Sequence, residues 1–178
     1  MLIIFSGLPG SGKSTIAQAL AKQLHAFYLR IDTIEQAIRK ADEDDREMGP
    51  TGYFVAYSLA RENLQLGATV IADSVNPLAL TRDAYREIAL SAKKIFLEIE
   101  IVCSDKTEHR KRVETRVSEV EGLILPDWKR VTDLSYEPWS REHLVLDSYR
   151  LSSDECVSRI IEVLSQSSAL ENLSSERV

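Results

Sequence analysis

A glycine-rich loop between an apolar run and a helix pattern opens the chain and most constrains its fold. Residues 2–6 form a short apolar run with the length of a buried strand, and residues 16–24 place apolar side chains at helical spacing. Between them, residues 7–15 read Gly-Leu-Pro-Gly-Ser-Gly-Lys-Ser-Thr, which meets the pattern G-x-x-x-x-G-K-[ST] in full. Because strand, loop and helix are the context that this motif requires, we predict that the loop binds a nucleoside triphosphate.

The residue types of this loop match the chemistry of phosphate binding. Glycines let the backbone turn consecutive N–H groups towards phosphate oxygens, and the helix that follows adds the positive end of its dipole. Lys13 would reach the β- and γ-phosphates, and the hydroxyl of Ser14 would ligate magnesium. A glycine-rich turn without this function needs neither the Lys-Ser pair nor a second glycine at this spacing. The residues expected to bind the nucleotide are Gly7, Gly10, Ser11, Gly12, Lys13, Ser14 and Thr15.

Composition indicates one domain in a reducing compartment. A chain of 178 residues with 44% hydrophobic residues is long enough to bury a sizeable core. Cys103 and Cys156 form no C-x-x-C pair, so we expect no disulfide framework and no zinc site, and a cytoplasmic location. The N-terminus lacks the basic region of a signal peptide, and we expect no membrane span. The net charge of −6 disfavours nucleic acid as a partner, although a local basic groove could override it.

Strand and helix patterns alternate along the rest of the chain. Further strands are expected over residues 27–31, 68–73, 94–103 and 143–147. Helices are expected over residues 33–39, 53–66, 79–91 and 105–117, around Trp128 and Val131, and after a capping box at residues 152–155. The charge run at 41–47 predicts a solvated, mobile connection. This alternation predicts an α/β fold with a parallel sheet that helices cover on both faces.

Acidic side chains occur within or at the ends of several predicted strands. Glu98 and Glu100 share one face of the fourth strand, which indicates that this face is less covered or that the strand frays near an edge. Asp32, Asp73 and Asp147 each end a strand, and ligands bind beyond the carboxyl ends of strands in parallel sheets. We therefore expect these three aspartates to lie near the phosphate-binding loop.

Asp32 and Asp73 differ in the roles that their sequence contexts suggest. Asp32 can accept the proton of an acceptor hydroxyl and align that hydroxyl with the γ-phosphate. Asp32 also suits a helix N-cap, with Glu35 completing a capping box, and the two roles compete for the same oxygens. Asp73 closes the apolar run of a Walker B element and would hold magnesium together with Ser14.

Two absent elements favour phosphate transfer to an acceptor other than water. Mechanical ATPases of the AAA+ type place a glutamate after the Walker B aspartate, where this chain has Ser74, and the guanine-binding element N-K-x-D is missing.

Arg112 and Arg116 are four residues apart on a predicted helix and would share a face, so they can offer guanidinium groups to the γ-phosphoryl oxygens. A solvated helix in which Glu108 and Glu114 pair with these arginines fits the same residues.

Histidine and aromatic side chains in the second half give weaker signals. His109 and His143 have no matching catalytic or metal-ligand partners in the pattern, which favours structural roles. Trp128, Tyr136 and Trp139 are compatible with a substrate or adenine pocket and equally with core packing.

Five segments together resemble the small P-loop kinases, a superfamily that includes AAA-type kinases, gluconate kinase, chloramphenicol phosphotransferase and the kinase domain of polynucleotide kinase. The matching segments are residues 7–15, Arg-Ile-Asp at 30–32, Ala-Asp-Ser-Val-Asn-Pro at 72–77, His-Arg-Lys-Arg-Val-Glu-Thr-Arg at 109–116 and Tyr-Glu-Pro-Trp at 136–139. The resemblance implies a P-loop fold with five parallel strands in the order 2-3-1-4-5. It further implies one domain over residues 1–165 with a short helical lid at about 105–135, before a tail over 166–178 that its serine-rich composition predicts to be disordered.

The resemblance also assigns roles. It implies that Asp32 activates the acceptor hydroxyl, that Arg112 and Arg116 belong to the lid, and that the loop after Asp147 packs near adenine. Glu35 departs from the polynucleotide kinases, which carry an arginine three residues after the acid. No histidine follows Asp32 as it does in gluconate kinases, and the mononucleotide pocket of adenylate kinase has no counterpart.

We therefore predict a kinase that uses ATP and Mg²⁺ to phosphorylate an alcohol group of a small molecule. The predicted catalytic residues are Lys13, Asp32, Arg112 and Arg116, and the predicted metal ligands are Ser14 and Asp73. Two alternatives stay open. One is a kinase for a nucleic-acid 5′-hydroxyl, which the acidic run argues against, and the other is an ATP-binding or hydrolysing switch module without a small-molecule acceptor.

Overall fold

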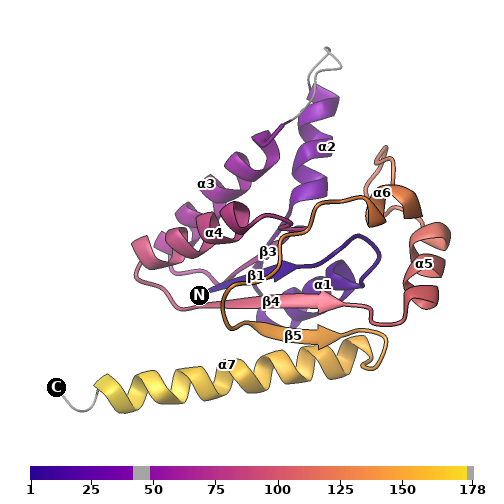
Figure 1. The fold of residues 1–178 in the computed structure, drawn as a ribbon. Coiled ribbons are helices and arrows are strands. Elements are labelled where there is room, and N and C mark those ends of the chain that lie inside the picture. Colours follow the sequence, from indigo (N-terminus) through magenta and orange to yellow (C-terminus); the bar gives the residue numbers. More distant parts are fainter. Residues whose placement is uncertain (42–48, 176–178) are drawn as a thin grey trace.

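Five parallel strands form one sheet in the order β2-β3-β1-β4-β5 (Figure 1). The strands are β1 (Leu2–Ser6), β2 (Phe27–Arg30), β3 (Val70–Asp73), β4 (Phe96–Val102) and β5 (Leu144–Asp147). The structure is a computed structural model and describes residues 1–41 and 49–175, with side chains to residue 166. The predicted fold class and strand order are confirmed. The mobile connection predicted over 41–47 falls almost wholly outside the described residues.

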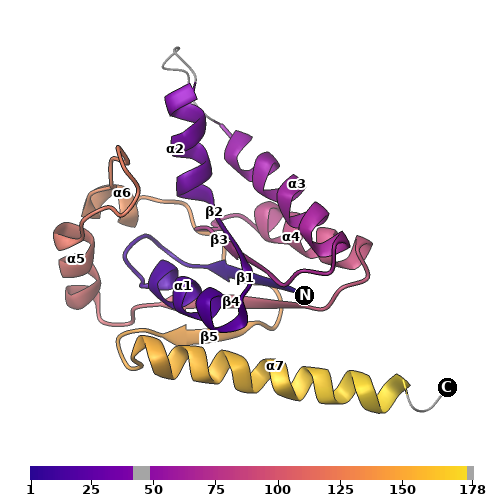
Figure 2. The ribbon, with the colours of Figure 1, turned by 180° about the vertical axis from the view of Figure 1, so that it is seen from behind.

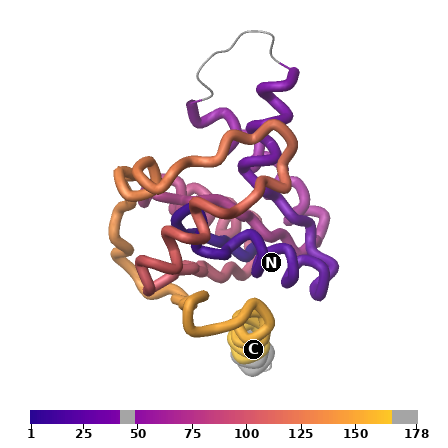
Figure 3. The backbone as a smooth tube through the Cα atoms, turned by 90° about the vertical axis from the view of Figure 1, so that its right-hand side faces the viewer, coloured from indigo at the N-terminus to yellow at the C-terminus, as the bar shows by residue number. Residues whose placement is uncertain are grey.

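Helices cover both faces of this sheet. They are α1 (Lys13–Leu24), α2 (Ile31–Ala41), α3 (Thr51–Gln65), α4 (Ala79–Ser91), α5 (Lys106–Thr115), α6 (Trp128–Thr132) and α7 (Ser153–Ser175). Seen from behind, α1 lies in front of the strands and above α7 (Figure 2), and these two helices pack together. Figure 3 views α7 nearly end-on, on the opposite side of the molecule from α2 and α3. Within the described ranges, no helix has both the length and the apolar character to cross a membrane.

Alternate residues of β1 pack into two separate hydrophobic cores, because successive side chains of a strand point to opposite faces. Ile3 and Phe5 pack in the cluster that α1 and α7 cover. Leu2 and Ile4 pack in the second cluster, which contains residues of α3 and α4. All five residues of β1 are buried, as expected for the central strand of a doubly covered sheet. The loop motif therefore starts from a fully buried central strand.

Strand β2 ends one residue earlier than its sequence pattern predicts. Ile31 has the β-branched side chain that favours strands, but it starts α2 and packs, only 5% exposed, in the second core cluster. Burial of one isoleucine decides the boundary here, because local propensity is weak beside tertiary packing. Asp32 therefore lies inside the first turn of α2 instead of before it.

The prediction that the face of Glu98 and Glu100 is poorly covered is wrong. Strand β4 lies between β1 and β5, and Glu98 is 5% exposed. Arg141 donates to both carboxylate oxygens of Glu98, from Nε at 2.8 Å and from Nη2 at 2.6 Å. Nε2 of His143 lies 3.2 Å from Oε2 of Glu100. Polar partners from the irregular segment before β5 thus cover this face.

The last helix extends into the segment predicted to be a disordered tail. Its predicted capping box is confirmed, since the backbone N–H of Ser152 donates to Oε2 of Glu155 and the N–H of Glu155 donates to Oγ of Ser152. Helix α7 then continues through Ser175. No proline or glycine interrupts residues 153–175, so a nucleated helix can propagate through serine-rich sequence. Residues 176–178 lie outside the described part of the chain, and the domain boundary at 165 stays a prediction.

Candidate active site

The loop between β1 and α1 takes a path that only glycine can follow at two positions. Gly7 has φ +139°, and a Cβ there would lie 2.3 Å from the carbonyl oxygen of Ile101. Gly10 has φ +83°, and a Cβ there would lie 2.5 Å from Cγ2 of Val113. Both sites combine a left-handed backbone with a close neighbour. The loop is therefore held tightly between β4 and α5, and it leads directly into the N-terminus of α1.

A pocket of about 230 Å³ lies at the α1 end of this loop. Its lining joins the loop and the start of α1 to the end of β2 and to the segment after α5: Gly10, Gly12, Lys13, Ser14, Thr15, Arg30, Arg112, Arg116, Val117, Ser118, Glu119 and Leu125. Among these described lining residues, four side chains are cationic and one is a carboxylate. A partly enclosed pocket with this charge and with the N-terminus of α1 favours a polyanion such as a nucleotide triphosphate.

Asp73 lies at the carboxyl end of β3, beside the loop, and is 1% exposed. Its Oδ2 accepts a hydrogen bond of 2.6 Å from the phenol of Tyr28, whereas Oδ1 has no hydrogen-bond partner within the described residues. Burial first, and then the charge and hydrogen bond of Asp73, raise the pKa of Tyr28 well above its usual value, so the phenol stays a donor. A buried carboxylate with one uncommitted oxygen is the kind of oxygen donor that can bind Mg²⁺, together with a hydroxyl such as that of Ser14.

Asp32 lies next to an arginine rather than in a capping interaction. Its side chain is 43% exposed, and Oδ2 lies 3.5 Å from Nε of Arg30. In the part of the chain that the structure describes, no hydrogen bond joins its carboxylate to a backbone N–H at the start of α2. The carboxylate is therefore accessible in the first turn of α2, as proton acceptance from a bound hydroxyl requires.

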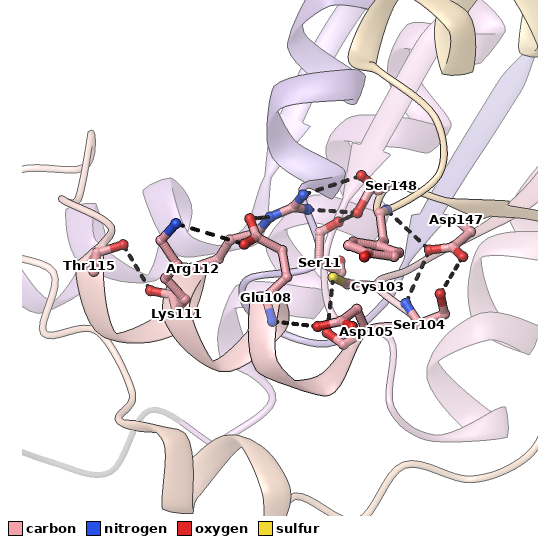
Figure 4. Close-up of polar contacts among 11 residues, drawn as sticks. Ser11, Cys103, Ser104, Asp105, Glu108, Lys111, Arg112, Thr115, Asp147 and Ser148 are labelled. Carbon is pink, nitrogen blue, oxygen red and sulfur yellow. Dashed lines mark hydrogen bonds and ion pairs between the residues drawn. The ribbon is translucent and has the colours of Figure 1, made fainter.

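Arg112 is fixed by three hydrogen bonds on the loop side of α5 (Figure 4). Its Nε donates to Oε1 of Glu108 at 2.9 Å, and its Nη1 and Nη2 donate to Oγ and the carbonyl oxygen of Ser148 at 2.9 and 3.3 Å. Ser148 in turn donates from Oγ to the carbonyl oxygen of Ser11 at 2.6 Å. The guanidinium group thus ties α5 to the phosphate-binding loop through the residue that follows β5.

Arg116 differs from Arg112 in both geometry and partners. Helix α5 ends at Thr115, and Arg116 is its C-cap with an extended backbone, so the predicted sharing of one helical face by the two arginines is wrong. Both nevertheless line the pocket. Nε and Nη2 of Arg116 are buried and have no hydrogen-bond partner among the described residues. Burial lowers the pKa of Arg116, and the nearby charge of Asp32 opposes this shift.

Asp147 has a local role at the end of β5. Its carboxylate accepts hydrogen bonds from the backbone N–H and the hydroxyl of Ser104 at 3.0 and 2.5 Å, and from the N–H of Tyr149 at 3.1 Å (Figure 4). Burial alone would raise the pKa of Asp147, but these hydrogen bonds hold it below its usual value. Asp147 therefore fixes the loop that presents Ser148.

The histidine and tryptophan side chains of the second half, whose roles the sequence left open, make packing contacts. His109 is buried, with Nε2 2.9 Å from the carbonyl oxygen of Pro9 and its ring edge-on to Trp128 at 5.2 Å. Trp139 stacks on His143 at 3.9 Å and lies 4.4 Å from the guanidinium of Arg82. Trp139 and His143 therefore pack, half-buried, beside β4, where His143 contacts Glu100.

Three residues of this region were missed by sequence reasoning: Tyr28, Arg30 and Ser148. The spacing of Tyr28 and Arg30 could have indicated their roles, because residues two apart on β2 share one face of the sheet. The register places Arg30 directly opposite Asp73. Ser148 could be found only as the residue after a strand-ending aspartate, which is a weak signal.

Comparison with known proteins gives one family and several relatives. A family model described as an AAA domain matches residues 2–130. The adenylyl-sulfate kinase of Bacillus velezensis is 28% identical over an alignment 178 residues long. The alignment covers 94% of this chain and 86% of the relative.

Two solved structures have the same fold. The APS kinase of Mycobacterium tuberculosis in complex with AMPPNP and APS has a TM-score of 0.69 at 20% identity, over 92% of this chain and 96% of that one. A gluconokinase of Sinorhizobium meliloti has a TM-score of 0.57 at 18% identity, over 93% and 96%. The loop motif, the strand order and the relatives all indicate the same family. The chain belongs to the AAA domain family and is a small P-loop kinase.

Proposed function

We propose that this kinase transfers the γ-phosphoryl group of ATP to a hydroxyl group of a small molecule, with Asp32 as the general base. One observation carries the proposal: the accessible carboxylate of Asp32, in the first turn of α2, lies 3.5 Å from Arg30, a residue that lines the cationic pocket. A base must lie within reach of both the acceptor hydroxyl and the γ-phosphate, and the carboxyl edge of a parallel sheet is where such ligands bind, which supports Asp32 as the candidate. Relatives named for adenylyl sulfate and for gluconate act on small molecules, which supports an acceptor of that size.

The nucleotide half of the site rests on the loop and its partners. The loop backbone and Lys13, which is 7% exposed, would hold the β- and γ-phosphates of ATP. Asp73 and Ser14 would hold Mg²⁺, because Oδ1 of Asp73 is buried without a hydrogen-bond partner in the described chain. When it is bound at these two residues, Mg²⁺ would neutralise part of the negative charge of the phosphates.

The transfer step assigns one task to each polar group. Asp32 takes the proton of the acceptor hydroxyl while the hydroxyl oxygen bonds to the γ-phosphorus and the bond to the β–γ bridging oxygen breaks, which leaves ADP. Arg116 has uncommitted Nε and Nη2 donors for the γ-phosphoryl oxygens, whose charge spreads in the transition state. Arg112 is already tied to Glu108 and Ser148, so its contribution is to keep the pocket wall in place.

An acceptor panel tests this proposal. The full chain with ATP and Mg²⁺ is incubated with hydroxyl compounds that include adenylyl sulfate, gluconate and a short 5′-hydroxyl oligonucleotide, and ADP and phosphorylated product are measured. We expect a small-molecule product. ADP release that no acceptor stimulates would favour the switch module, and a product on the oligonucleotide alone would favour the nucleic-acid kinase.

The role of Asp32 has a separate test. Asp32→Asn should keep the affinity for AMPPNP and lower the rate of product formation by roughly 10²–10⁴-fold, the contribution of a positioned base. Asp154→Asn is a matched control, because Asp154 also lies in the first turn of a helix but on α7. Equal activity of the Asp32→Asn variant and the wild type would exclude the base.

A further inference from the structure

Arg30 and Gln18 hold a carboxylate of the protein itself at the edge of the pocket. Oε2 of Glu119 accepts a hydrogen bond from Nη1 of Arg30 at 3.3 Å and another from Nε2 of Gln18 at 3.0 Å. These donors come from β2 and α1, whereas Glu119 belongs to the segment after α5. Donors from a strand and a helix thus converge on one oxygen of a segment outside any helix or strand.

The two partners of this ion pair differ sharply in exposure. The side chain of Arg30 is 14% exposed, whereas that of Glu119 is 68% exposed. An exposed carboxylate keeps most of its interaction with water and contributes little through such a pair, so another anion can displace it at small cost. Arg30 is already desolvated, so it gains strongly from any oxyanion that reaches it.

Arg30 also has a donor that Glu119 does not use. Its Nε is buried and has no hydrogen-bond partner in the described part of the chain, although Oδ2 of Asp32 lies 3.5 Å away. An unused buried guanidinium N–H costs free energy unless a ligand satisfies it. The position beside Asp32 places this donor on the acceptor side of the pocket.

We propose that Arg30 and Gln18 form a subsite for an oxyanion of the acceptor, which Glu119 occupies until the acceptor displaces it. The acceptor class is then an alcohol that also carries a phosphate, sulfate or carboxylate group. This inference rests on the proposed function, because Asp32 defines the acceptor side. The guanidinium of Arg30 and the amide of Gln18 already donate to one carboxylate oxygen, so both can donate to an oxygen of such a group.

Sulfate binding to the nucleotide-loaded protein tests the subsite without any turnover. Sodium sulfate is titrated by calorimetry into the full chain saturated with AMPPNP and Mg²⁺, with sodium chloride at matched ionic strength as the reference. AMPPNP occupies the loop, so sulfate that still binds reports a second anion site. We expect one sulfate per chain.

Variants decide which residues bind this sulfate. Arg30→Gln should weaken sulfate binding by about tenfold or more, the loss of hydrogen bonds to a charged group, and should change AMPPNP affinity less than about twofold. Arg30→Lys should retain part of the binding, and Glu119→Gln should strengthen it because the internal competitor loses its charge. Arg61→Gln, an exposed arginine of α3, is the control and should match the wild type.

Two results would overturn the subsite: no sulfate bound to the AMPPNP-loaded wild type, or an Arg30→Gln variant that loses AMPPNP affinity together with sulfate. The proposed function fails differently, by the absence of a phosphorylated small molecule in the acceptor panel while sulfate binds as expected.

Discussion

The phenol of Tyr28 donates a hydrogen bond of 2.6 Å to Oδ2 of Asp73, across the paired strands β2 and β3. This contact leaves Oδ1 as the uncommitted oxygen of a buried carboxylate. The orientation of Asp73 therefore depends on a side chain whose pKa, raised by burial, keeps it protonated and donating.

Tyr28→Phe should leave a buried carboxylate oxygen without its donor. We expect a loss of about 1–3 kcal/mol in the free energy of unfolding, and a weaker enhancement of AMPPNP binding by Mg²⁺. Urea denaturation and AMPPNP titrations with Mg²⁺ or with EDTA measure the two effects. Tyr57→Phe removes a hydroxyl that donates to the carbonyl oxygen of Thr81 and should change stability only. Identical Mg²⁺ dependence in wild type and Tyr28→Phe would contradict the orienting role.

Lys13→Ala should abolish most phosphoryl transfer, because the charge on the β- and γ-phosphates loses its buried cation. The expected fall in kcat is about 10²–10³-fold, the size of the loss of one preorganised electrostatic donor. Lys22→Ala, at the exposed end of the same helix, is the matched control and should behave as the wild type. A Lys13→Ala enzyme with wild-type turnover would remove the loop from the proposed mechanism.

The scaffold of the site could be predicted from sequence because its signals are local. The apolar run of β1, the loop motif and the acid that ends β3 lie in short segments whose chemistry fixes their conformation, whereas Asp32 lies in α2 and not at the end of β2. Arg30 and Asp73 face each other because both stand at the carboxyl ends of neighbouring parallel strands. Alternation of strands and helices then predicts the parallel sheet itself.

The polar contacts could not be predicted, because each depends on residues far apart in sequence. Tyr28 and Asp73 are 45 positions apart, and Glu98 and Arg141 are 43 apart. The pairing of Glu98 with Arg141 depends on where the irregular segment before β5 lies against β4, for which the sequence carries no periodic signal. The contact of Tyr28 with Asp73 depends on which strand pairs with β3 and in which register. For the same reason, burial of Ile31 in the second core cluster overrode the strand propensity that set the predicted end of β2.

Stability should depend on pH through Glu35, which packs against the start of α3. A Cβ on Gly52 would lie 2.4 Å from Cγ of Glu35, and Arg39 is its ion-pair partner at 3.8 Å. Burial raises the pKa of Glu35 above 4.5, against the opposing effect of Arg39. The folded state thus favours the protonated carboxyl, so this contribution to stability is complete below the unfolded pKa and is lost as pH rises through the folded pKa.

Glu35→Gln should therefore be more stable than the wild type at pH 7, and the difference should shrink as pH falls towards 4.5. Urea midpoints measured between these pH values report the trend. Glu87→Gln, on the exposed face of α4, should show no such pH-dependent difference. A gain for Glu35→Gln that is constant with pH would mean that packing, not ionisation, causes it.

Arg141→Met should destabilise the protein more than any surface substitution, because it leaves the Glu98 carboxylate buried on β4 without its bidentate partner. Glu98 has a side chain that is 4% exposed, and Arg141 also donates to Oδ1 of Asp83 at 2.5 Å. Hydrogen bonding to Glu98 first, against burial, raises the pKa of Arg141, so the guanidinium is charged at every pH of interest. We expect a loss of about 3–5 kcal/mol in the free energy of unfolding, measured by urea denaturation.

A double variant separates the two causes of that loss. Glu98→Gln combined with Arg141→Met removes the unpaired buried charge and should recover much of the stability, because the penalty comes from the isolated carboxylate and not from a missing attraction. Arg110→Gln breaks an exposed pair with Glu114 on α5 and should cost at most about 0.5 kcal/mol. If the double variant is no more stable than Arg141→Met alone, the arginine acts by packing on Trp139, whose ring centre lies 5.6 Å from its guanidinium carbon.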